Sequence, residues 1–259
     1  MFLSQLMVNP GSSPDQPRPG IAWISQTYRV HQRIWMAFPD TNRVETDPFF
    51  LGSWSVQTGA KPRRAECGFL FRIEHDLPLR VLVQSTLRPN WDYAFRNAQH
   101  LLEGTPKVRE FEPRYETGTA YRFRLVMQMV TRRTLPKHAV TAGVKRRTEH
   151  PIRCTLPTAD PDGRATPDPL LRAWRDRMSE VARRCGFDLE QDPQQLKVQS
   201  VRNLHMKPEA GQPARGFNAA LFEGIIRCTD AERLAHSVIN GVGRGKAFGM
   251  GLLSLAQMR

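Results

Sequence analysis

The fold of this chain is decided by residues 69–85, FLFRIEHDLPLRVLVQS. The stretch holds two short runs rich in aromatic and β-branched residues, 69–74 and 80–85, with Asp76 and Pro78 between them. Runs of this composition separated by turn-forming residues predict two consecutive strands. The elements that precede and follow this pair therefore set the architecture of the first half of the chain.

Helical patterns lie on both sides of this strand pair. Thr27 is a good N-cap, and apolar residues recur at helical spacing after it until Pro39 stops the pattern. A weaker helical pattern covers residues 91–102. With strands at 2–8 and 108–112, the order becomes β-α-β-β-α-β, which is the ferredoxin-like arrangement.

The second half of the chain repeats this series. A capping box of Thr229 and Glu232 is expected to start its last helix. The predicted strands are residues 121–130, 196–204, 219–228 and 248–256, and the predicted helices are residues 170–185 and 231–240. We therefore predict an α+β chain of two tandem ferredoxin-like (RRM-like) βαββαβ domains, residues 1–115 and 116–259, joined near residues 112–119.

The chain carries a strong positive charge. Its 259 residues include 38 Lys plus Arg against 25 Asp plus Glu, a formal net charge of +13. Such a charge favours polyanions, so nucleic acid is the leading class of partner. A solvated charged surface is the alternative for any single cluster. Several arginines form adjacent pairs that suit bidentate contacts to phosphate: Arg63 and Arg64, Arg132 and Arg133, Arg146 and Arg147, and Arg183 and Arg184.

Cysteine usage and hydropathy predict a cytoplasmic protein. The four cysteines are far apart and form no C-x-x-C pair, so the sequence predicts neither a zinc site nor a disulfide framework. No run of about 18 apolar residues and no signal peptide is recognised, so we expect no membrane attachment. No metal and no other cofactor is expected.

Three segments lack a regular pattern. Residues 10–20 are rich in Pro, Gly and Ser and are expected to form a loop. Residues 41–66 and 136–169 are rich in basic and turn-forming residues and are expected to be insertions. A basic cluster in the second insertion is either a loop or hairpin that enters a groove of structured RNA or a solvated excursion. Its members are Lys145, Arg146 and Arg147.

A basic glycine-rich segment, GVGRGKAFGMG at residues 241–251, lies between the last helix and the last strand. Dinucleotide-binding and Walker loops need a strand before their glycines and a helix after them, so the order here argues against both. Two interpretations remain: a phosphate cradle for a nucleic-acid strand, or a helix C-cap followed by a loose turn. In the first, the contact residues are Gly241, Gly243, Arg244, Gly245 and Lys246.

Two side chains of the first predicted helix can do chemistry. Tyr28 and His31 are three residues apart, so the phenol and the imidazole share one helix face. Imidazole, with a reference pKa of about 6.5, moves a proton in either direction without a metal. Beside bound RNA it can promote attack of the 2′-hydroxyl on the adjoining phosphate and protonate the departing 5′-oxygen. The alternative is an aromatic stripe packed on the sheet, with His31 satisfied and partly buried.

Taken together, these segments resemble a known family. Its members are the CasE endoribonucleases of type I-E CRISPR systems, and the resemblance covers nearly the whole chain in order and spacing. The combination of a Y-x-x-H-Q helix with a terminal G-x-G-x-G-K-A-x-G-x-G-L-L-S-L-A is specific. The matching segments are residues 28–35 (YRVHQRIW), the strands at 69–74 and 81–85, residues 222–224 (FEG) and residues 241–256.

The resemblance implies an enzyme that binds the hairpin of the CRISPR repeat and cuts each repeat once at the base of the stem. Cleavage in this family is metal-independent and leaves a 5′-hydroxyl and a cyclic 2′,3′-phosphate. The resemblance also implies that Tyr28 and His31 are catalytic and that the glycine-rich segment, with Arg244 and Lys246, contacts RNA. We expect a monomer when free, which keeps its product and joins the Cascade surveillance complex.

Two other functions stay open at the level of sequence. A non-catalytic subunit that holds a hairpin RNA within a ribonucleoprotein would not need His31 for chemistry. A duplex-DNA-binding protein fits the charge, but the chain lacks the signature of a recognition helix.

Overall fold

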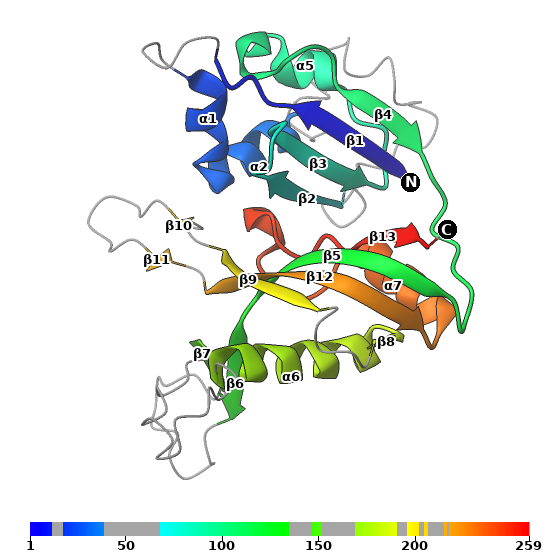
Figure 1. The fold of residues 1–259 in the computed structure, drawn as a ribbon. Coiled ribbons are helices and arrows are strands. Elements are labelled where there is room, and N and C mark those ends of the chain that lie inside the picture. Colours follow the sequence, from blue (N-terminus) through cyan, green and yellow to red (C-terminus); the bar gives the residue numbers. More distant parts are fainter. Residues whose placement is uncertain are drawn as a thin grey trace.

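The structure of the chain, a computed structural model, describes most of its residues. These are residues 1–11, 18–38, 68–134, 147–151, 169–190, 196–201, 205–206, 215–216 and 218–258. They form two α+β domains, drawn one above the other in Figure 1, each built on an antiparallel sheet. No helix in this described part of the chain is long and apolar enough to cross a membrane.

The N-terminal domain has a four-stranded sheet with the strand order β2-β3-β1-β4. Its strands are β1 (Phe2–Met7), β2 (Phe69–Glu74), β3 (Arg80–Ser85) and β4 (Lys107–Glu110). The helices share one apolar core with the sheet. They are α1 (Pro19–Ile24), α2 (Thr27–Trp35), α5 (Trp91–Phe95) and the 3-10 helix η2 (Gln99–Leu101). Element order and strand order are those of a ferredoxin-like domain, as predicted.

The strand pair on which the prediction rests has two distinct faces. Phe71 of β2 pairs with Val83 of β3, and both side chains are fully buried in the core. Because successive side chains of a strand point to opposite faces, Arg80 and Leu82 lie on the other face. That face looks toward the C-terminal domain, where both residues line a cavity between the domains.

Local details of the N-terminal domain differ from the sequence prediction. Helix α1 begins at Pro19, inside the segment expected to be a loop, because proline is well suited to the first turn of a helix. The N-cap of α2 is Gln26, without a side-chain cap, so the prediction of Thr27 at this position was wrong. Thr27 is instead the first helical residue and is buried. The helix expected over 91–102 consists of two short pieces, α5 and η2.

The C-terminal domain repeats the arrangement with one variation. Its sheet has the order β13-β5-β12-β8, and β9 also pairs with β12, so β8 and β9 together take the place of one strand. The strands are β5 (Ala120–Gln128), β8 (Phe187–Leu189), β9 (Lys197–Val201), β12 (Ala219–Cys228) and β13 (Ser254–Gln257). The helices, α6 (Pro169–Arg184) and α7 (Ala231–Asn240), share a second apolar core with this sheet.

Two predictions at the C-terminal end of the chain are corrected. The side chain of Asp230, not that of Thr229, caps α7 by accepting a hydrogen bond from the amide of Arg233 over 3.0 Å. The last strand begins at Ser254 rather than at residue 248. Glycines with positive φ, at Gly249 and elsewhere in 241–251, hold this segment out of the extended conformation until its end.

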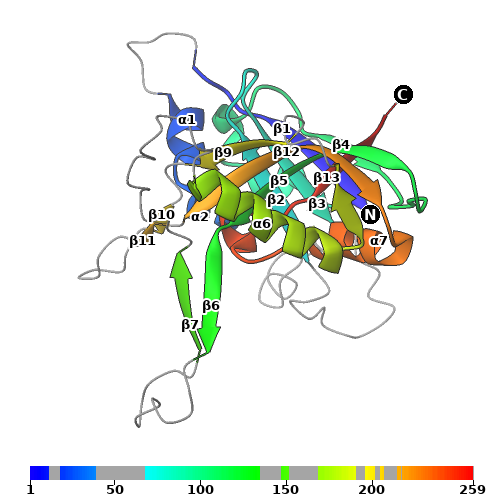
Figure 2. The same ribbon diagram turned by 60° about the horizontal axis from the view of Figure 1, so that its bottom comes forward.

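Two small hairpins extend the C-terminal domain. Strands β6 (Val130–Thr134) and β7 (Arg147–Pro151) pair with each other and project from the body of the molecule in Figure 2. Strands β10 (His205–Met206) and β11 (Arg215–Gly216) form the second hairpin. Lys145 and Arg146 lie outside the described residues, and Arg147 is described only as the first residue of β7.

Candidate active site

Tyr28 and His31 lie together on one face of α2, as their spacing predicts. Their ring centroids are 6.2 Å apart and their planes are inclined by 25°. The side chain of Tyr28 is 45% exposed, whereas His31 is partly buried. A solvent-exposed phenol therefore lies beside an imidazole that is partly enclosed by other residues of the protein.

Aromatic side chains of the sheet surround the imidazole. The ring of His31 lies 5.1 Å from that of Phe69 and 6.1 Å from that of Phe71, and Trp35 lies 6.3 Å away on the same helix. The Nδ1 atom of His31 is buried. The structure therefore agrees with both interpretations of the spacing. His31 packs against the sheet, as in an aromatic stripe, and it also lies next to an exposed phenol, as in a chemical site.

The glycine-rich segment completes this site from the other domain. It contains a short 3-10 helix, η5 (Lys246–Phe248), which lies against α2 and β2. The ring of Phe248 stacks on that of Tyr28 with centroids 6.2 Å apart and planes inclined by 30°. The candidate catalytic pair therefore stands at the boundary between the two domains.

The conformation of the glycines explains how the segment approaches so closely. Residues 241–251 contain five glycines with φ between 74° and 88°. A Cβ atom on Gly241 would lie 2.7 Å from Cδ2 of Leu70, and one on Gly249 would lie 3.2 Å from Cε2 of Phe71. Because both neighbours belong to β2, these glycines allow the segment to pack against the N-terminal domain.

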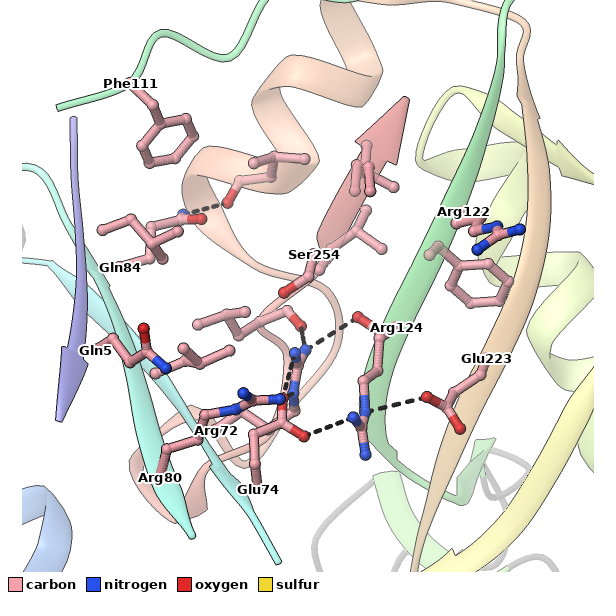
Figure 3. A pocket seen from close by; sticks show the side chains of 18 of the residues that line it. Gln5, Arg72, Glu74, Arg80, Gln84, Phe111, Arg122, Arg124, Glu223 and Ser254 are labelled. Atoms are coloured by element: carbon pink, nitrogen blue, oxygen red, sulfur yellow. Dashed lines mark hydrogen bonds and ion pairs between the residues drawn. The ribbon is translucent and has the colours of Figure 1, made fainter. Parts of the chain in front are cut away.

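A network of charged residues ties the same two domains together nearby. Arg72 contacts Glu74 through Nη2 over 2.7 Å, and the guanidinium of Arg124 in β5 contacts the other oxygen of Glu74 over 2.8 Å. Arg124 also pairs with Asp76 over 3.0 Å and with Glu223 over 3.2 Å. Figure 3 shows Arg72 and Glu74 from one sheet meeting Arg124 and Glu223 from the other.

Burial affects the two guanidinium groups of this network differently. Burial lowers the pKa of Arg72 from its ordinary value, and the adjacent Glu74 only partly offsets this effect. Burial also acts to lower the pKa of Arg124, but its contacts with Asp76, Glu74 and Glu223 outweigh it and raise the pKa. The network is therefore a set of paired charges that joins the two sheets.

The open faces of the two sheets enclose a cleft of about 1180 Å³. Its walls include Arg72, Glu74, Arg124 and Glu223 of the charged network. They also carry further cations, so basic side chains outnumber acidic ones in the cleft. The additional cations are Arg80, Lys107, Arg109, Arg122 and Lys197. A smaller cavity of about 450 Å³ adjoins the active-site face, where Thr27 and Phe248 form part of its wall. The net positive lining of the cleft favours a polyanionic or acidic partner.

Comparison with known proteins identifies the family. The model of a family described as CRISPR associated protein matches residues 1–257. The chain belongs to this family.

Individual members of the family resemble the chain over its full length. CRISPR-associated endoribonuclease Cse3 of Thermus thermophilus is 29% identical over 269 residues, which cover 99% of this chain and all of the relative. A solved structure of Cse3 bound to a 19 nt RNA has a TM-score of 0.62 at 22% identity, with 98% of each chain covered. Cas6e from Escherichia coli K-12 has a TM-score of 0.56 at 20% identity over both full chains. These matches confirm the resemblance and the fold expected from the sequence.

The structure of this family member brings only part of the predicted site together. Tyr28 and His31 lie beside the glycine-rich segment, but the residues of this segment that were predicted to contact RNA have different surroundings. Gly243 and Arg244 are exposed, whereas the ammonium group of Lys246 donates a hydrogen bond to the carbonyl oxygen of Asn240 at the end of α7. Contact of these residues with RNA stays a prediction, as it does for Lys145, Arg146 and Arg147.

Sequence reasoning missed two features of the site. The contact of Phe248 with Tyr28 joins opposite ends of the chain and leaves no local pattern. The charged network did leave a signal, since Arg72 and Glu74 stand two apart in an otherwise apolar strand and so share one face. Among the described residues, no group of three or more His, Cys, Asp or Glu side chains is placed to hold a metal ion.

Proposed function

We propose that this protein is a metal-independent endoribonuclease that binds the stem-loop of a CRISPR repeat and cuts precursor CRISPR RNA. The observation that supports it is the placement of Tyr28 and His31 side by side on α2, against the glycine-rich segment of the other domain. The full-length similarity to a protein named an endoribonuclease adds to this support. A non-catalytic RNA-binding subunit is the alternative.

The proposed reaction uses a nucleophile that RNA itself supplies. The 2′-oxygen attacks the adjoining phosphorus and gives up its proton, the bond from phosphorus to the 5′-oxygen breaks, and that oxygen takes a proton. The products are a cyclic 2′,3′-phosphate and a 5′-hydroxyl. The imidazole of His31 serves one or both of the proton transfers, because it changes protonation near neutral pH.

Tyr28 and His31 have complementary parts in this mechanism. The exposed phenol of Tyr28 can donate a hydrogen bond to a phosphate oxygen or accept one from a ribose hydroxyl. The aromatic packing of His31 against Phe69 and Phe71 limits the positions of the imidazole. A reacting group held in one geometry is more effective than a mobile one.

The partners follow from the charge and from the relatives. The net charge of +13 and the basic glycine-rich segment suit an RNA backbone. Cse3 has been solved bound to RNA, and a chain of a solved CRISPR RNA-guided surveillance complex matches this one at 21% identity with a TM-score of 0.51 over both full chains. We propose that the protein is a monomer when free, acts in the cytoplasm, retains its guide RNA and assembles with the other Cascade subunits.

The decisive experiment measures cleavage of the cognate repeat hairpin in EDTA. His31→Ala should lower the single-turnover rate by roughly 10²–10⁴-fold while RNA affinity is kept. A substrate with a 2′-deoxy group at the scissile nucleotide should bind and stay intact. His100→Ala is the matched control, because that histidine is exposed on η2.

Two outcomes would contradict the proposal in different ways. Normal cutting by His31→Ala would remove this residue from the reaction. A wild-type protein that binds the hairpin tightly and never cuts it would favour the non-catalytic RNA-binding subunit.

A further inference from the structure

The phenol of Tyr28 is held by rings from both domains. Tyr28 is the second residue of α2 and is 45% exposed. His31 lies against it from the same helix, and Phe248 stacks on it from the C-terminal domain. An exposed tyrosine at the first turn of a helix has several accessible rotamers, and an aromatic neighbour on one side restricts them.

Phe248 is itself held firmly by its own segment. It ends η5, and its amide donates to the carbonyl oxygen of Gly245 over 2.8 Å. The glycines on either side of η5, Gly245 and Gly249, both take the left-handed conformation that closes such a short turn. The ammonium group of Lys246 fastens the same turn to the end of α7.

Further bonds fix the rest of the segment to the C-terminal sheet. The amide of Gly251 donates to the carbonyl oxygen of Val126 in β5 over 2.8 Å, and its own carbonyl oxygen accepts from Val242 over 2.8 Å. The side chain of Met250 is fully buried. The position of Phe248 is therefore set by the C-terminal domain, whereas that of Tyr28 is set by the N-terminal domain.

Close packing brings these two positions together. The place of a Cβ on Gly249 lies 3.6 Å from Cγ2 of Thr27, the residue before Tyr28. That separation is an ordinary van der Waals contact, and the same Cβ would lie only 3.2 Å from Cε2 of Phe71, so position 249 has little room for a larger side chain. The structure thus keeps Phe248 in ring contact with the tyrosine across the domain boundary.

We propose that Phe248 is a positioning residue for RNA cleavage, which acts by holding the phenol of Tyr28 in the orientation needed at the scissile phosphate. This inference rests on the proposed function of Tyr28. Phenylalanine has no group that transfers a proton or binds phosphate, so its effect on the reaction must pass through its neighbours. It also makes cleavage depend on the correct contact between the two domains.

The test compares single-turnover cleavage with hairpin affinity. Phe248→Ala should lower the cleavage rate by about tenfold or more, because small displacements of a reacting group are costly, and should change RNA affinity by less than about threefold. Phe248→Tyr, which keeps the aromatic face, should restore most of the rate. Phe2→Ala is the matched control, since Phe2 is a partly buried phenylalanine of β1 that lines neither cavity.

A double-mutant cycle separates positioning from general destabilisation. In a Tyr28→Phe background the phenol oxygen is gone, so Phe248→Ala should cause little further loss of rate. Thermal unfolding of each variant is measured alongside, and Phe248→Leu replaces the alanine variant if that variant fails to fold. An effect through destabilisation alone would persist unchanged in the Tyr28→Phe background.

The failures of the two proposals are distinguishable. A wild-type rate for Phe248→Ala and Phe248→Leu, or an equal loss of rate with and without the phenol oxygen, would overturn the positioning role while leaving the proposed enzyme intact. A wild-type rate for Tyr28→Phe would overturn both the positioning role and the catalytic assignment of Tyr28.

Discussion

The guanidinium of Arg72 in β2 donates a hydrogen bond to the carbonyl oxygen of Leu252 across the domain boundary, over 3.0 Å. Leu252 directly follows the glycine-rich segment. The same Nη1 atom also donates to the carbonyl oxygen of Arg124 over 3.0 Å. Arg72 therefore connects the strand that packs against His31 to the end of the segment that packs against Tyr28.

Loss of Arg72 should destabilise the whole protein. Arg72→Met leaves the carboxylate of Glu74, 2% exposed, without one of its two cations, so we expect a loss of about 3–5 kcal/mol in the free energy of unfolding. Urea unfolding measures this loss, and adding Glu74→Leu should recover part of it. Arg114→Met is the control: it breaks an ion pair whose side chains are 81% and 68% exposed and should cost less than about 1 kcal/mol. Equal losses in the two arginine variants would contradict this role of Arg72.

A substitution in the glycine-rich segment should cost more than one at an open glycine. Gly241 has φ 74° and ψ 156°, and its Cβ would meet Leu70, so Gly241→Ala should lose about 1–3 kcal/mol from strain and more from the close contact. Gly104 also has a positive φ, 79°, but nothing within 4 Å of its Cβ, so Gly104→Ala reports the cost of a side chain at positive φ without a close contact. Chemical denaturation of both variants checks the difference. Identical costs would contradict the extra cost expected at Gly241.

Arg244 should contribute to RNA affinity through charge alone. It is an exposed cation of the glycine-rich segment, so Arg244→Ala should weaken hairpin binding and lower the slope of log affinity against log salt by about 1. The cleavage rate at saturating enzyme should stay unchanged. Arg114→Ala, which removes an arginine that is 81% exposed and lies outside the glycine-rich segment, is the matched control and should alter neither quantity. An unchanged salt slope for Arg244→Ala would remove this residue from the RNA contact.

Tyr115 should make the protein less stable at alkaline pH. Burial, with a smaller effect of Tyr121, raises the pKa of Tyr115 to about 12, above its ordinary value of 10.0. A group whose pKa is higher in the folded state contributes stability below the unfolded pKa and loses it as pH rises, here between about 10 and 12. Tyr115→Phe cannot ionise, so its unfolding free energy should fall less than that of the wild type over this range. Parallel pH profiles of the two proteins would contradict the assignment.

Prediction from sequence succeeded where the determining pattern is local. The strands at 69–74 and 80–85 form with the predicted bounds because aromatic and β-branched composition and the turn residues between them are encoded within a few positions. Tyr28 and His31 share a face because helical spacing requires it. The N-cap residues of the helices were less predictable, because two neighbouring residues can both have a suitable side chain. Asp230 caps α7, although Thr229 before it also has a side chain that can accept the hydrogen bond.

The sequence by itself determined the two βαββαβ halves, the helix that carries Tyr28 and His31, and the positive charge that favours nucleic acid. Each of these depends on composition or on spacing within one element. Only the tertiary structure decided that Phe248 meets Tyr28 and that Arg72 binds Leu252. Those contacts join segments from distant parts of the chain. They form because the glycine-rich segment packs against the N-terminal domain, and no local pattern specifies this packing.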